Sequence, residues 1–482
     1  MARTTSPTAP ASSRANPRLS HRQAVAWITG AGLLVRGLLL GAAPLWTDEA
    51  FMGVVVRRPF AAMIDVVHND NHPPLQYLLD RLAVVVHDSP GALRLPSLVA
   101  GTAAVPIAMA LGRRLGGDRA AQASGLTVAF MPLLVLWSRD ARMYALATTM
   151  VLAMALALWR AVEQPSRSRL AVYFVVTVVA LYSQYFVALA VVAQLGAALL
   201  FLRPPRGVAV RLLAAAAAAG LTLLPWLLYA APQFRHAGDP YWIQPLALSS
   251  VLPGLADLVT HPGPTSLVDA AALIGIPLAT WLAVRAYRRS EPGARQGFLF
   301  LLGSGGFALT VLAVVSLKKP LLDERFTNLF TTELLPIAGA ALAATRRRWV
   351  LGAVVLALAA VTIVQESTLP TPDVPAILAP IAGHVEPGRD VVALNGPYHY
   401  FQVLYYGDPG TRASARVVAT SVPWYFGLAG FRVGDIVPSV PDPSGTLYLL
   451  NDPGQGRPDM PADLHLARRQ CAKGTCMEAW TH

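Results

Sequence analysis

Eleven apolar runs follow one another along the chain, and they constrain its fold more than any other feature. Most come close to the ~20 residues that a helix needs to cross a bilayer. They cover approximately residues 23–45, 92–112, 119–138, 143–162, 168–183, 185–202, 208–230, 267–286, 297–316, 325–344 and 349–367. Only 14% of the 482 residues are charged, against about a quarter in soluble proteins. The sequence therefore predicts an all-α polytopic membrane protein with about 11 transmembrane helices, and it excludes a soluble or disordered chain.

The first run, 23–45, superficially resembles a secretory signal peptide. It is longer than the apolar part of such a signal, and it has no convincing small-residue cleavage site before Trp46. We interpret it as a retained first transmembrane helix. Residues 1–22 carry arginines and prolines but nothing that could pack, which predicts a disordered cytoplasmic tail.

Arginines gather in alternate loops between the runs, as they do in cytoplasmic loops. With the N-terminus inside, these loops contain Arg113, Arg114, Arg119, Arg160, Arg167, Arg169, Arg203, Arg206, Arg211, Arg285, Arg288, Arg289, Arg295, Arg346, Arg347 and Arg348. The pattern explains the net charge of +12 without a nucleic-acid partner. It predicts a multi-pass protein of the cell membrane with residues 23–367 as its transmembrane domain. The segments 46–91, 231–266 and 368–482 then lie outside.

The segment 368–482 differs in composition from the rest of the chain. Its β-rich runs at 390–394, 400–406, 415–420 and 445–450 are separated by Pro, Gly and Asp, which predicts a small extracytoplasmic α/β domain. Cys471 and Cys476 both lie in it, on the oxidising side of the membrane. A short-loop disulfide is the favoured interpretation, and two free thiols are the alternative.

Acidic residues are scarce, and the adjacent pair Asp48 and Glu49 follows directly after the first run. A carboxylate at the outer surface could take the proton of an acceptor hydroxyl as a general base. The structural alternative is a helix cap, with Thr47 or Asp48 capping the helix predicted after it. The two roles are compatible, so the pair is a catalytic candidate.

A second set of candidates consists of basic residues on the outer side, where orientation does not call for them. They are Arg94, Arg139, Arg142, Lys318, Lys319 and Arg325. If their segments converge, they form a cationic pocket for a phosphate or pyrophosphate, which arginine can bind in a bidentate manner. The alternative is that they reach lipid headgroups. Arg36 joins the set because it lies inside the first run, where a charge usually faces a bundle interior or cavity, or else pairs with an acid for packing.

A polar segment after the acidic pair contains Asp65, His68, Asp70 and His72, followed by two prolines and Tyr77. The two histidines are four residues apart, so a divalent metal on Asp70 and His72 is one interpretation, although spacing alone supports it weakly. The sequence has no P-loop, dinucleotide fingerprint, serine elbow or zinc-protease helix. We expect no required cofactor, and any donor substrate should arrive through the membrane.

Five short motifs occur in order between about residues 30 and 160. They are Trp46-Thr47-Asp48-Glu49-Ala50, His72-Pro73-Pro74-Leu75 with Tyr77, Leu93-Arg94-Leu95-Pro96-Ser97, Gly112-Arg113-Arg114-Leu115 and Ser138-Arg139-Asp140-Ala141-Arg142-Met143-Tyr144. Each motif is weak alone. Together they resemble the N-terminal half of family 39-like glycosyltransferases of the GT-C superfamily, whose relatives include protein O-mannosyltransferases and the lipid A aminoarabinose transferase. Relatives commonly have Arg-Tyr where this chain has Arg325 and Phe326, so a contact through that hydroxyl is absent here.

The resemblance implies an enzyme that moves a sugar from a polyprenyl-phosphate donor to an acceptor hydroxyl on the outer face, with inversion. Asp48 would be the base and Glu49 would position the base or the acceptor. The basic residues would hold the leaving phosphate, while His72, Tyr77 and Tyr144 would contact substrate. Mannose is the first expectation for the sugar and arabinose or another pentose the second. The acceptor would be a glycan, a lipid or a protein.

Two other classes of protein fit part of the pattern. A transporter or flippase for a polyprenyl-linked or other amphiphilic substrate also needs many spans, but such proteins usually show internal repeats and ionisable residues at the midplane. This sequence shows no fixed-period repeat, and its unexplained polar residues gather at one face. An inactive receptor that only binds a polyprenyl lipid is the other class, and the intact Asp48 and Glu49 argue against it.

Overall fold

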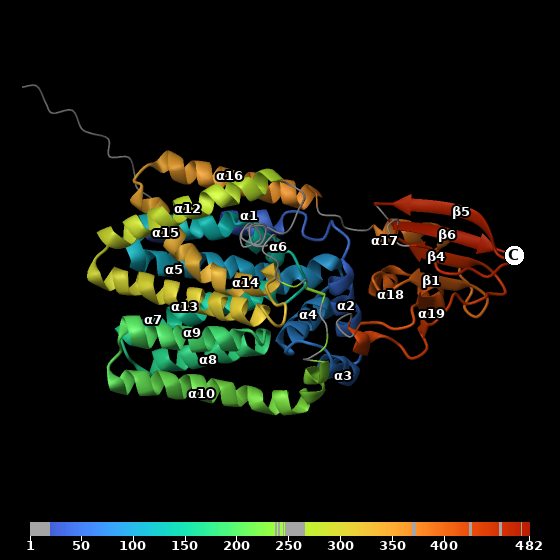
Figure 1. The fold of residues 1–482 in the computed structure, drawn as a ribbon, viewed down its shortest axis with the longest axis horizontal. Helices are drawn as coiled ribbons and strands as arrows, with labels where there is room; N and C mark the ends of the chain where they lie inside the picture. Colours follow the sequence, from blue (N-terminus) through green and yellow to red (C-terminus); the bar gives the residue numbers. More distant parts are fainter. Residues whose placement is uncertain are drawn as a thin grey trace, which may run out of the picture.

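A computed structural model describes residues 20–236, 239, 242–243, 245, 266–368, 373–423, 427–452, 456–473 and 475–482. A long bundle of helices makes up most of the molecule, and an α/β domain lies against one end of it (Figure 1). The predicted tail 1–22 and the outer loop 231–266 lie largely outside the described residues.

Each predicted apolar run contains helix where the structure describes it, so the helical bundle is confirmed. The first run, 23–45, is helical only as far as Gly37. Its helices are α1 (His21–Gly37), α5 (Pro90–Phe130), α6 (Pro132–Ser138), α7 (Tyr144–Glu163), α8 (Arg167–Ser183), α9 (Val187–Ala197), α10 (Arg206–Tyr229), α12 (Ser266–Arg289), α13 (Pro292–Ser316), α14 (Glu324–Thr331), α15 (Leu335–Ala344) and α16 (Arg348–Thr368). Within the described residues, 5 helices are long and apolar enough to cross a membrane by length and composition: α5, α7, α10, α13 and α16. The count of eleven spans stays a prediction.

Helix α5 joins two of the predicted runs, and two glycines separate its halves. Gly116 and Gly117 have non-helical backbone angles, and Gly117 has φ +70° and ψ −159°, a conformation that favours glycine. A Cβ atom built on Gly112 would meet the hydroxyl of Ser124, so residues on either side of the break lie in contact. The chain therefore reverses direction here, at the arginine-rich loop that the sequence predicted.

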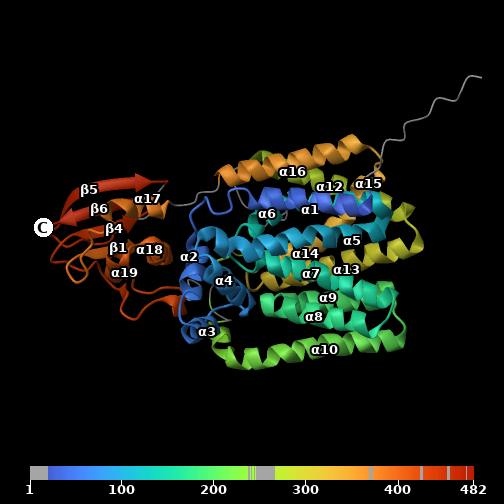
Figure 2. The same ribbon diagram turned by 180° about the vertical axis from the view of Figure 1, so that it is seen from behind.

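Three short helices lie between the bundle and the C-terminal domain, and they fold the predicted loop 46–91 (Figure 2). They are α2 (Thr47–Val56), α3 (Phe60–Asn69) and α4 (Leu75–Val86). Their buried side chains, among them Met52 and Met63, share one apolar cluster with Phe401 and Leu394 of the C-terminal domain. The two parts of the molecule are thus joined through a continuous core.

The C-terminal domain is built on a six-stranded sheet of order β3-β2-β1-β4-β6-β5. The strands are β1 (Val391–Asn395), β2 (Ala415–Val418), β3 (Ile436–Val437), β4 (Leu447–Asn451), β5 (His465–Ala472) and β6 (Thr475–Thr481). Strands β1 to β4 pair in parallel, and β6 runs antiparallel to both β4 and β5. Short helices α17 (Val374–Leu378), α18 (Tyr400–Tyr406) and α19 (Pro409–Ser414) complete the domain. Cys471 and Cys476 are paired across the β5–β6 hairpin and joined by a disulfide.

The predicted strand at 400–406 is wrong, because this segment is helix α18. The aromatic run that suggested a strand lies between two parallel strands, β1 and β2. Parallel neighbours need a crossover connection, which is usually helical. The other three predicted strand runs overlap β1, β2 and β4.

Candidate active site

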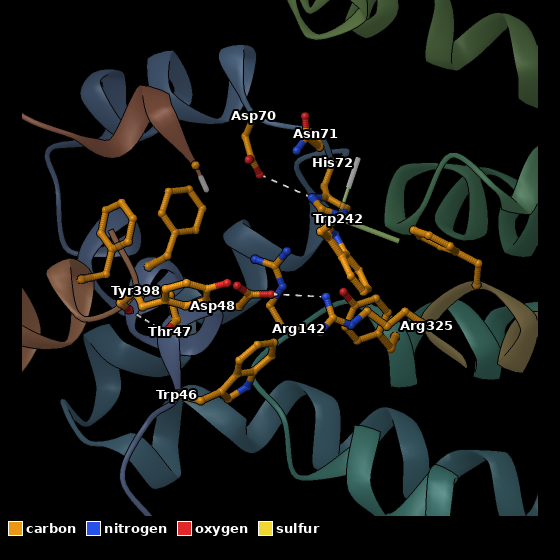
Figure 3. A pocket seen from close by; sticks show the side chains of 15 residues that line it. Trp46, Thr47, Asp48, Asp70, Asn71, His72, Arg142, Trp242, Arg325 and Tyr398 are labelled. Carbon is orange, nitrogen blue, oxygen red and sulfur yellow. Dashed lines mark hydrogen bonds and ion pairs between the residues drawn. The ribbon is translucent and has the colours of Figure 1, made fainter. Parts of the chain in front are cut away.

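A pocket of about 240 Å³ opens where the bundle, the three short helices and the C-terminal domain meet (Figure 3). Its lining combines aromatic rings with a few charged side chains. The residues are Trp46, Thr47, Asp48, Phe51, Asp70, Asn71, His72, Arg142, Tyr144, Trp242, Arg325, Phe326, Tyr398, Phe401 and Gly427. Several of these belong to the sequence motifs, and the fold brings them together from distant parts of the chain.

Asp48 lies in the first turn of α2 and reaches the pocket with its side chain about one-third exposed (32%). Its carboxylate oxygen is 4.0 Å from a terminal nitrogen of Arg325. The N-cap position belongs to Trp46, and the Thr47 hydroxyl donates to the carbonyl of Tyr398. The capping role considered for Thr47 and Asp48 is therefore not what the structure shows, and the Asp48 carboxylate faces the pocket.

Two arginines converge on Asp48 from different elements (Figure 3). Arg142 lies in the turn between α6 and α7 and is 5% exposed. Burial alone would lower the pKa of its guanidinium, but Asp48, Tyr144, Tyr77 and Asp70 together outweigh burial and raise it. Within the described part of the chain, the Arg142 Nε atom has no hydrogen-bond partner. Arg142 therefore has donor capacity available for an anion in the pocket.

Arg325, near the start of α14, is placed by aromatic rings. Its guanidinium carbon lies 4.4 Å from the ring centre of Trp242 and 5.4 Å from that of Trp46. Such contacts hold a cation without using its hydrogen-bond donors. Asp323 lies 3.9 Å from its Nε atom. Arg325 thus presents a positive charge to the pocket beside Asp48.

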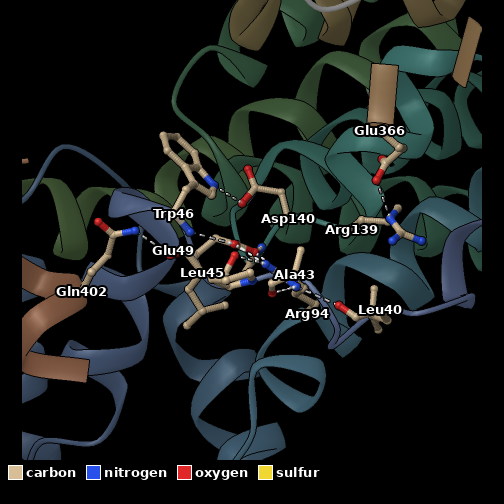
Figure 4. A network of polar contacts seen from close by, with 12 residues as sticks. Leu40, Ala43, Leu45, Trp46, Glu49, Arg94, Arg139, Asp140, Glu366 and Gln402 are labelled. Atoms are coloured by element: carbon tan, nitrogen blue, oxygen red, sulfur yellow. Dashed lines mark hydrogen bonds and ion pairs between the residues drawn. The ribbon is translucent and has the colours of Figure 1, made fainter. Parts of the chain in front are cut away.

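Glu49 is buried and does not line the pocket, and it lies in a network of polar contacts with Arg94 (Figure 4). Its carboxylate accepts two hydrogen bonds from Arg94, at 2.7 and 2.6 Å, and a third from the backbone N–H of Ala141 at 2.9 Å. Ala141 directly precedes Arg142, while Glu49 directly follows Asp48. The buried carboxylate therefore fixes the distance between the segment that carries Asp48 and the turn that carries Arg142.

Arg94 does not reach the pocket, because its donors are already used. Besides Glu49, it donates to the backbone carbonyls of Leu40, Ala43 and Pro44 at 2.8 to 3.2 Å. It therefore holds the segment between α1 and α2. Arg94 thus has a structural role and does not contribute to the predicted phosphate site.

Arg36 and Arg139 also lie away from the pocket. Arg36 is fully buried and donates to Ser138 and to the carbonyls of Ala129 and Val128, at the junction of α5 and α6. Arg139 donates to the carbonyls at the end of α1 and pairs with Glu366 of α16 at 3.3 Å. Both side chains donate hydrogen bonds to backbone carbonyls at the ends of helices. We therefore do not count them among the residues that could bind a phosphate.

Lys318 and Lys319 follow the end of α13 and do not line the pocket. Lys318 is exposed and Lys319 is half-buried. Of the seven basic residues that the sequence singled out, the pocket gathers only Arg142 and Arg325.

Asp70 and His72 line another wall of the pocket, while Tyr77 is fully buried and does not line it. The Tyr77 hydroxyl donates to Asp70, and the His72 ring lies 3.4 Å from the same carboxylate. Burial would raise the pKa of Asp70, but His72, Arg142 and Tyr77 together lower it. The pKa of His72 is lowered, mainly by burial.

The structure brings two candidate metal ligands together at this wall, Asp70 and His72. Among the residues that the structure describes, no third His, Cys, Asp or Glu joins this pair within metal-binding distance. A structural zinc site commonly has four protein ligands. The metal interpretation stays a prediction, and we assign no step to it.

Asp140 is a buried carboxyl group that the sequence analysis did not single out. Its Oδ1 accepts a hydrogen bond from the indole of Trp46 at 3.0 Å (Figure 4). Burial, and then the charge of Glu49, raises the pKa of Asp140 to about 8. The buried carboxyl group orients the ring of Trp46, which lines the pocket.

The pocket also contains aromatic residues that the sequence analysis missed. Trp242 lies in the predicted outer loop, and Tyr398 and Phe401 come from the C-terminal domain. The only signal for Phe401 was the run 400–406 that we interpreted as a strand, and Tyr398 lies just before that run. Their position shows that the C-terminal domain forms one wall of the pocket.

A sequence profile of the family described as dolichyl-phosphate-mannose-protein mannosyltransferase matches residues 71–229. No curated protein matches the chain significantly.

Solved structures extend this similarity over most of the chain. ArnT from Cupriavidus metallidurans bound to undecaprenyl phosphate aligns with a TM-score of 0.62 at 15% identity, over 94% of this chain and 97% of that chain. The same protein in the apo state aligns with 0.64 at 16% identity and the same coverage. Archaeal oligosaccharyltransferase AglB from Archaeoglobus fulgidus, in complex with an inhibitory peptide and a dolichol-phosphate, aligns with 0.50 at 11% identity, over 89% and 69%. The chain has the GT-C fold, and the resemblance that the motifs indicated is confirmed.

Proposed function

We propose that the protein is a membrane glycosyltransferase that moves a sugar from a polyprenyl-phosphate donor to an acceptor hydroxyl, with inversion. The observation that carries the proposal is one pocket carboxylate, Asp48, facing two guanidinium groups, Arg142 and Arg325. The polyprenyl phosphates bound to two proteins of the same fold support this class of donor. The arginine-rich loops support placing the pocket on the outer face of the cell membrane.

In the proposed reaction, Asp48 takes the proton of the acceptor hydroxyl as that oxygen attacks the anomeric carbon. The bond from this carbon to the phosphate oxygen breaks at the same time, and its electron pair leaves with the polyprenyl phosphate. Negative charge on the phosphate therefore grows toward the transition state, where Arg142 and Arg325 stabilise it. A direct displacement inverts the anomeric configuration and needs no covalent enzyme intermediate.

The remaining pocket residues would bind the sugars. Tyr144, Trp46, Trp242 and His72 all line the pocket. Tyr77 would act behind the wall by fixing Asp70. Mannose is our first proposal for the donor sugar, with arabinose or another pentose second, and the acceptor is a glycan, lipid or protein hydroxyl.

A donor panel tests the proposal and identifies the sugar. The purified protein in proteoliposomes would be supplied with synthetic polyprenyl-phosphate mannose, arabinose and glucose, together with a membrane extract as the acceptor source. We expect release of polyprenyl phosphate from one donor and transfer of its sugar. Movement of the intact donor across the bilayer without release would instead favour a flippase.

A further inference from the structure

The backbone directly before Asp48 is held by the C-terminal domain. The N–H of Leu45 donates to the hydroxyl of Tyr406 at 2.7 Å. The side-chain amide of Gln402 donates to the carbonyl of Leu45 at 2.9 Å. Both partners belong to α18, so the position of the proposed base depends on where this helix lies.

His399, at the start of α18, fixes Gln402 in turn. Its Nδ1 lies 2.8 Å from the amide oxygen of Gln402, and its Nε2 lies 3.0 Å from a carboxylate oxygen of Asp452. The hydroxyl of Thr475 donates to the same Asp452 oxygen at 2.8 Å. The result is a chain of hydrogen bonds from the end of β4 to the segment that carries Asp48.

The directions of these bonds determine the protonation of His399. The Gln402 amide nitrogen is committed to the Leu45 carbonyl, so the amide oxygen, an acceptor, faces the histidine. The carboxylate of Asp452 is also an acceptor. A neutral imidazole has only one N–H, whereas the imidazolium can donate to both partners.

We propose that His399 is a positioning residue whose imidazolium form ties the C-terminal domain to the segment that carries the base. The inference rests on the proposed role of Asp48 and deepens it. When His399 loses its proton, one of its two hydrogen bonds is lost, and α18 no longer holds the Leu45 carbonyl as firmly. Transfer then slows because the base is less well oriented toward the acceptor hydroxyl.

The surroundings of His399 agree with a charged ring. Burial alone would lower its pKa, but the hydrogen bonds to Asp452 and Gln402 outweigh burial and raise it. The same bond lowers the pKa of Asp452. Asp452 is the charged group that faces the ring, and the polar groups around the pair are Gln402 of α18 and Thr475 of β6.

Because the pKa of His399 is raised, both of its hydrogen bonds are formed below about pH 6.5, which is the ordinary pKa of histidine. The contact weakens as the pH rises through the higher value in the folded protein. We therefore expect an alkaline decrease in kcat, with little change in the KM for the donor.

Two substitutions test this origin of the alkaline decrease. Asp452→Asn supplies an amide donor to Nε2, so a neutral His399 can keep both hydrogen bonds, and the decrease should disappear. His399→Gln removes the ring, so its kcat should stay about tenfold below the acidic plateau of wild type and show no further alkaline decrease. His465→Gln, on exposed β5, is the matched control and should keep the wild-type profile.

Hydrogen exchange of the full-length protein gives a readout that does not depend on activity. At pH 6.5, a peptide containing Leu45 should exchange about tenfold faster in His399→Gln than in wild type or in His465→Gln. Unchanged exchange, or an alkaline decrease that persists in Asp452→Asn, would overturn the proposal. Absence of transfer from every donor in wild type would contradict the proposed function instead, and the exchange result would still decide whether the contact exists.

Discussion

At the scale of single residues, the adjacent acids Asp48 and Glu49 are assigned to different tasks by their surroundings. Asp48 faces a pocket and two guanidinium groups, whereas Glu49 is buried with Arg94 and the Ala141 amide. The sequence predicted that both acids matter. Only the family resemblance assigned Asp48 as the base and Glu49 as a positioning residue. The residue pattern alone could not separate them, because consecutive helical residues point in different directions and packing decides which side chain faces the pocket.

The two pocket arginines should be sensitive even to a conservative substitution. Lysine keeps the charge but cannot form a bidentate contact with phosphate. We expect Arg142→Lys and Arg325→Lys each to lower kcat/KM for the donor by about 10-fold or more. Arg139→Lys is the matched control, because Arg139 lies away from the pocket, and donor titrations should show wild-type kcat/KM for it. Equal effects in all three variants would remove the distinction that the structure makes.

Asp140 should make stability depend on pH. Its pKa in the folded protein is raised to about 8 from the model-compound value of 3.8. Between these values the folded protein binds more protons than the unfolded chain, so stability falls as the pH rises. The loss should be about 1 kcal/mol per pH unit. Asp140→Asn keeps an acceptor for Trp46, and its melting temperature in detergent should vary less between pH 5 and 8; a slope equal to that of wild type would contradict this.

At the scale of elements, the apolar runs predicted the helices well, because membrane helices must be apolar along most of their length. Helix α18 was missed because aromatic residues favour strands locally, while its helical state follows from the parallel pairing of β1 and β2. The convergence of α2, α14 and α18 on one pocket depends on contacts between residues hundreds of positions apart, such as that of Leu45 with Tyr406. No local pattern carries this information.

The reversal inside α5 should not tolerate a side chain at Gly117. Gly117 has a φ of +70°, and an alanine there should cost about 1–3 kcal/mol. Gly352→Ala in α16 is the control, because a Cβ atom there meets nothing within 4 Å and alanine favours a helix. We expect thermal unfolding in detergent to show a loss for Gly117→Ala and none for Gly352→Ala. Equal melting temperatures would argue against the reversal.

At the scale of the whole molecule, orientation in the membrane is the prediction on which the proposed chemistry depends. The two native cysteines are joined in a disulfide, so a single added cysteine can be labelled selectively. In intact cells, a membrane-impermeant maleimide should label Asp459→Cys in the C-terminal domain. It should label Arg347→Cys, between α15 and α16, only after permeabilisation. The opposite pattern would place the pocket on the cytoplasmic side.

In the proposed reaction, Asp48 removes the acceptor proton while the polyprenyl phosphate leaves. The most direct test of this step is the rate of polyprenyl phosphate release under donor saturation, in wild type and in Asp48→Asn. Asparagine is nearly the same size but cannot act as the base. We predict that Asp48→Asn lowers the rate of release by about 10²-fold or more and leaves the melting temperature unchanged. The sugar in the wild-type product should have the anomeric configuration opposite to that in the donor. If a folded Asp48→Asn variant released polyprenyl phosphate at the wild-type rate, Asp48 would not be the base.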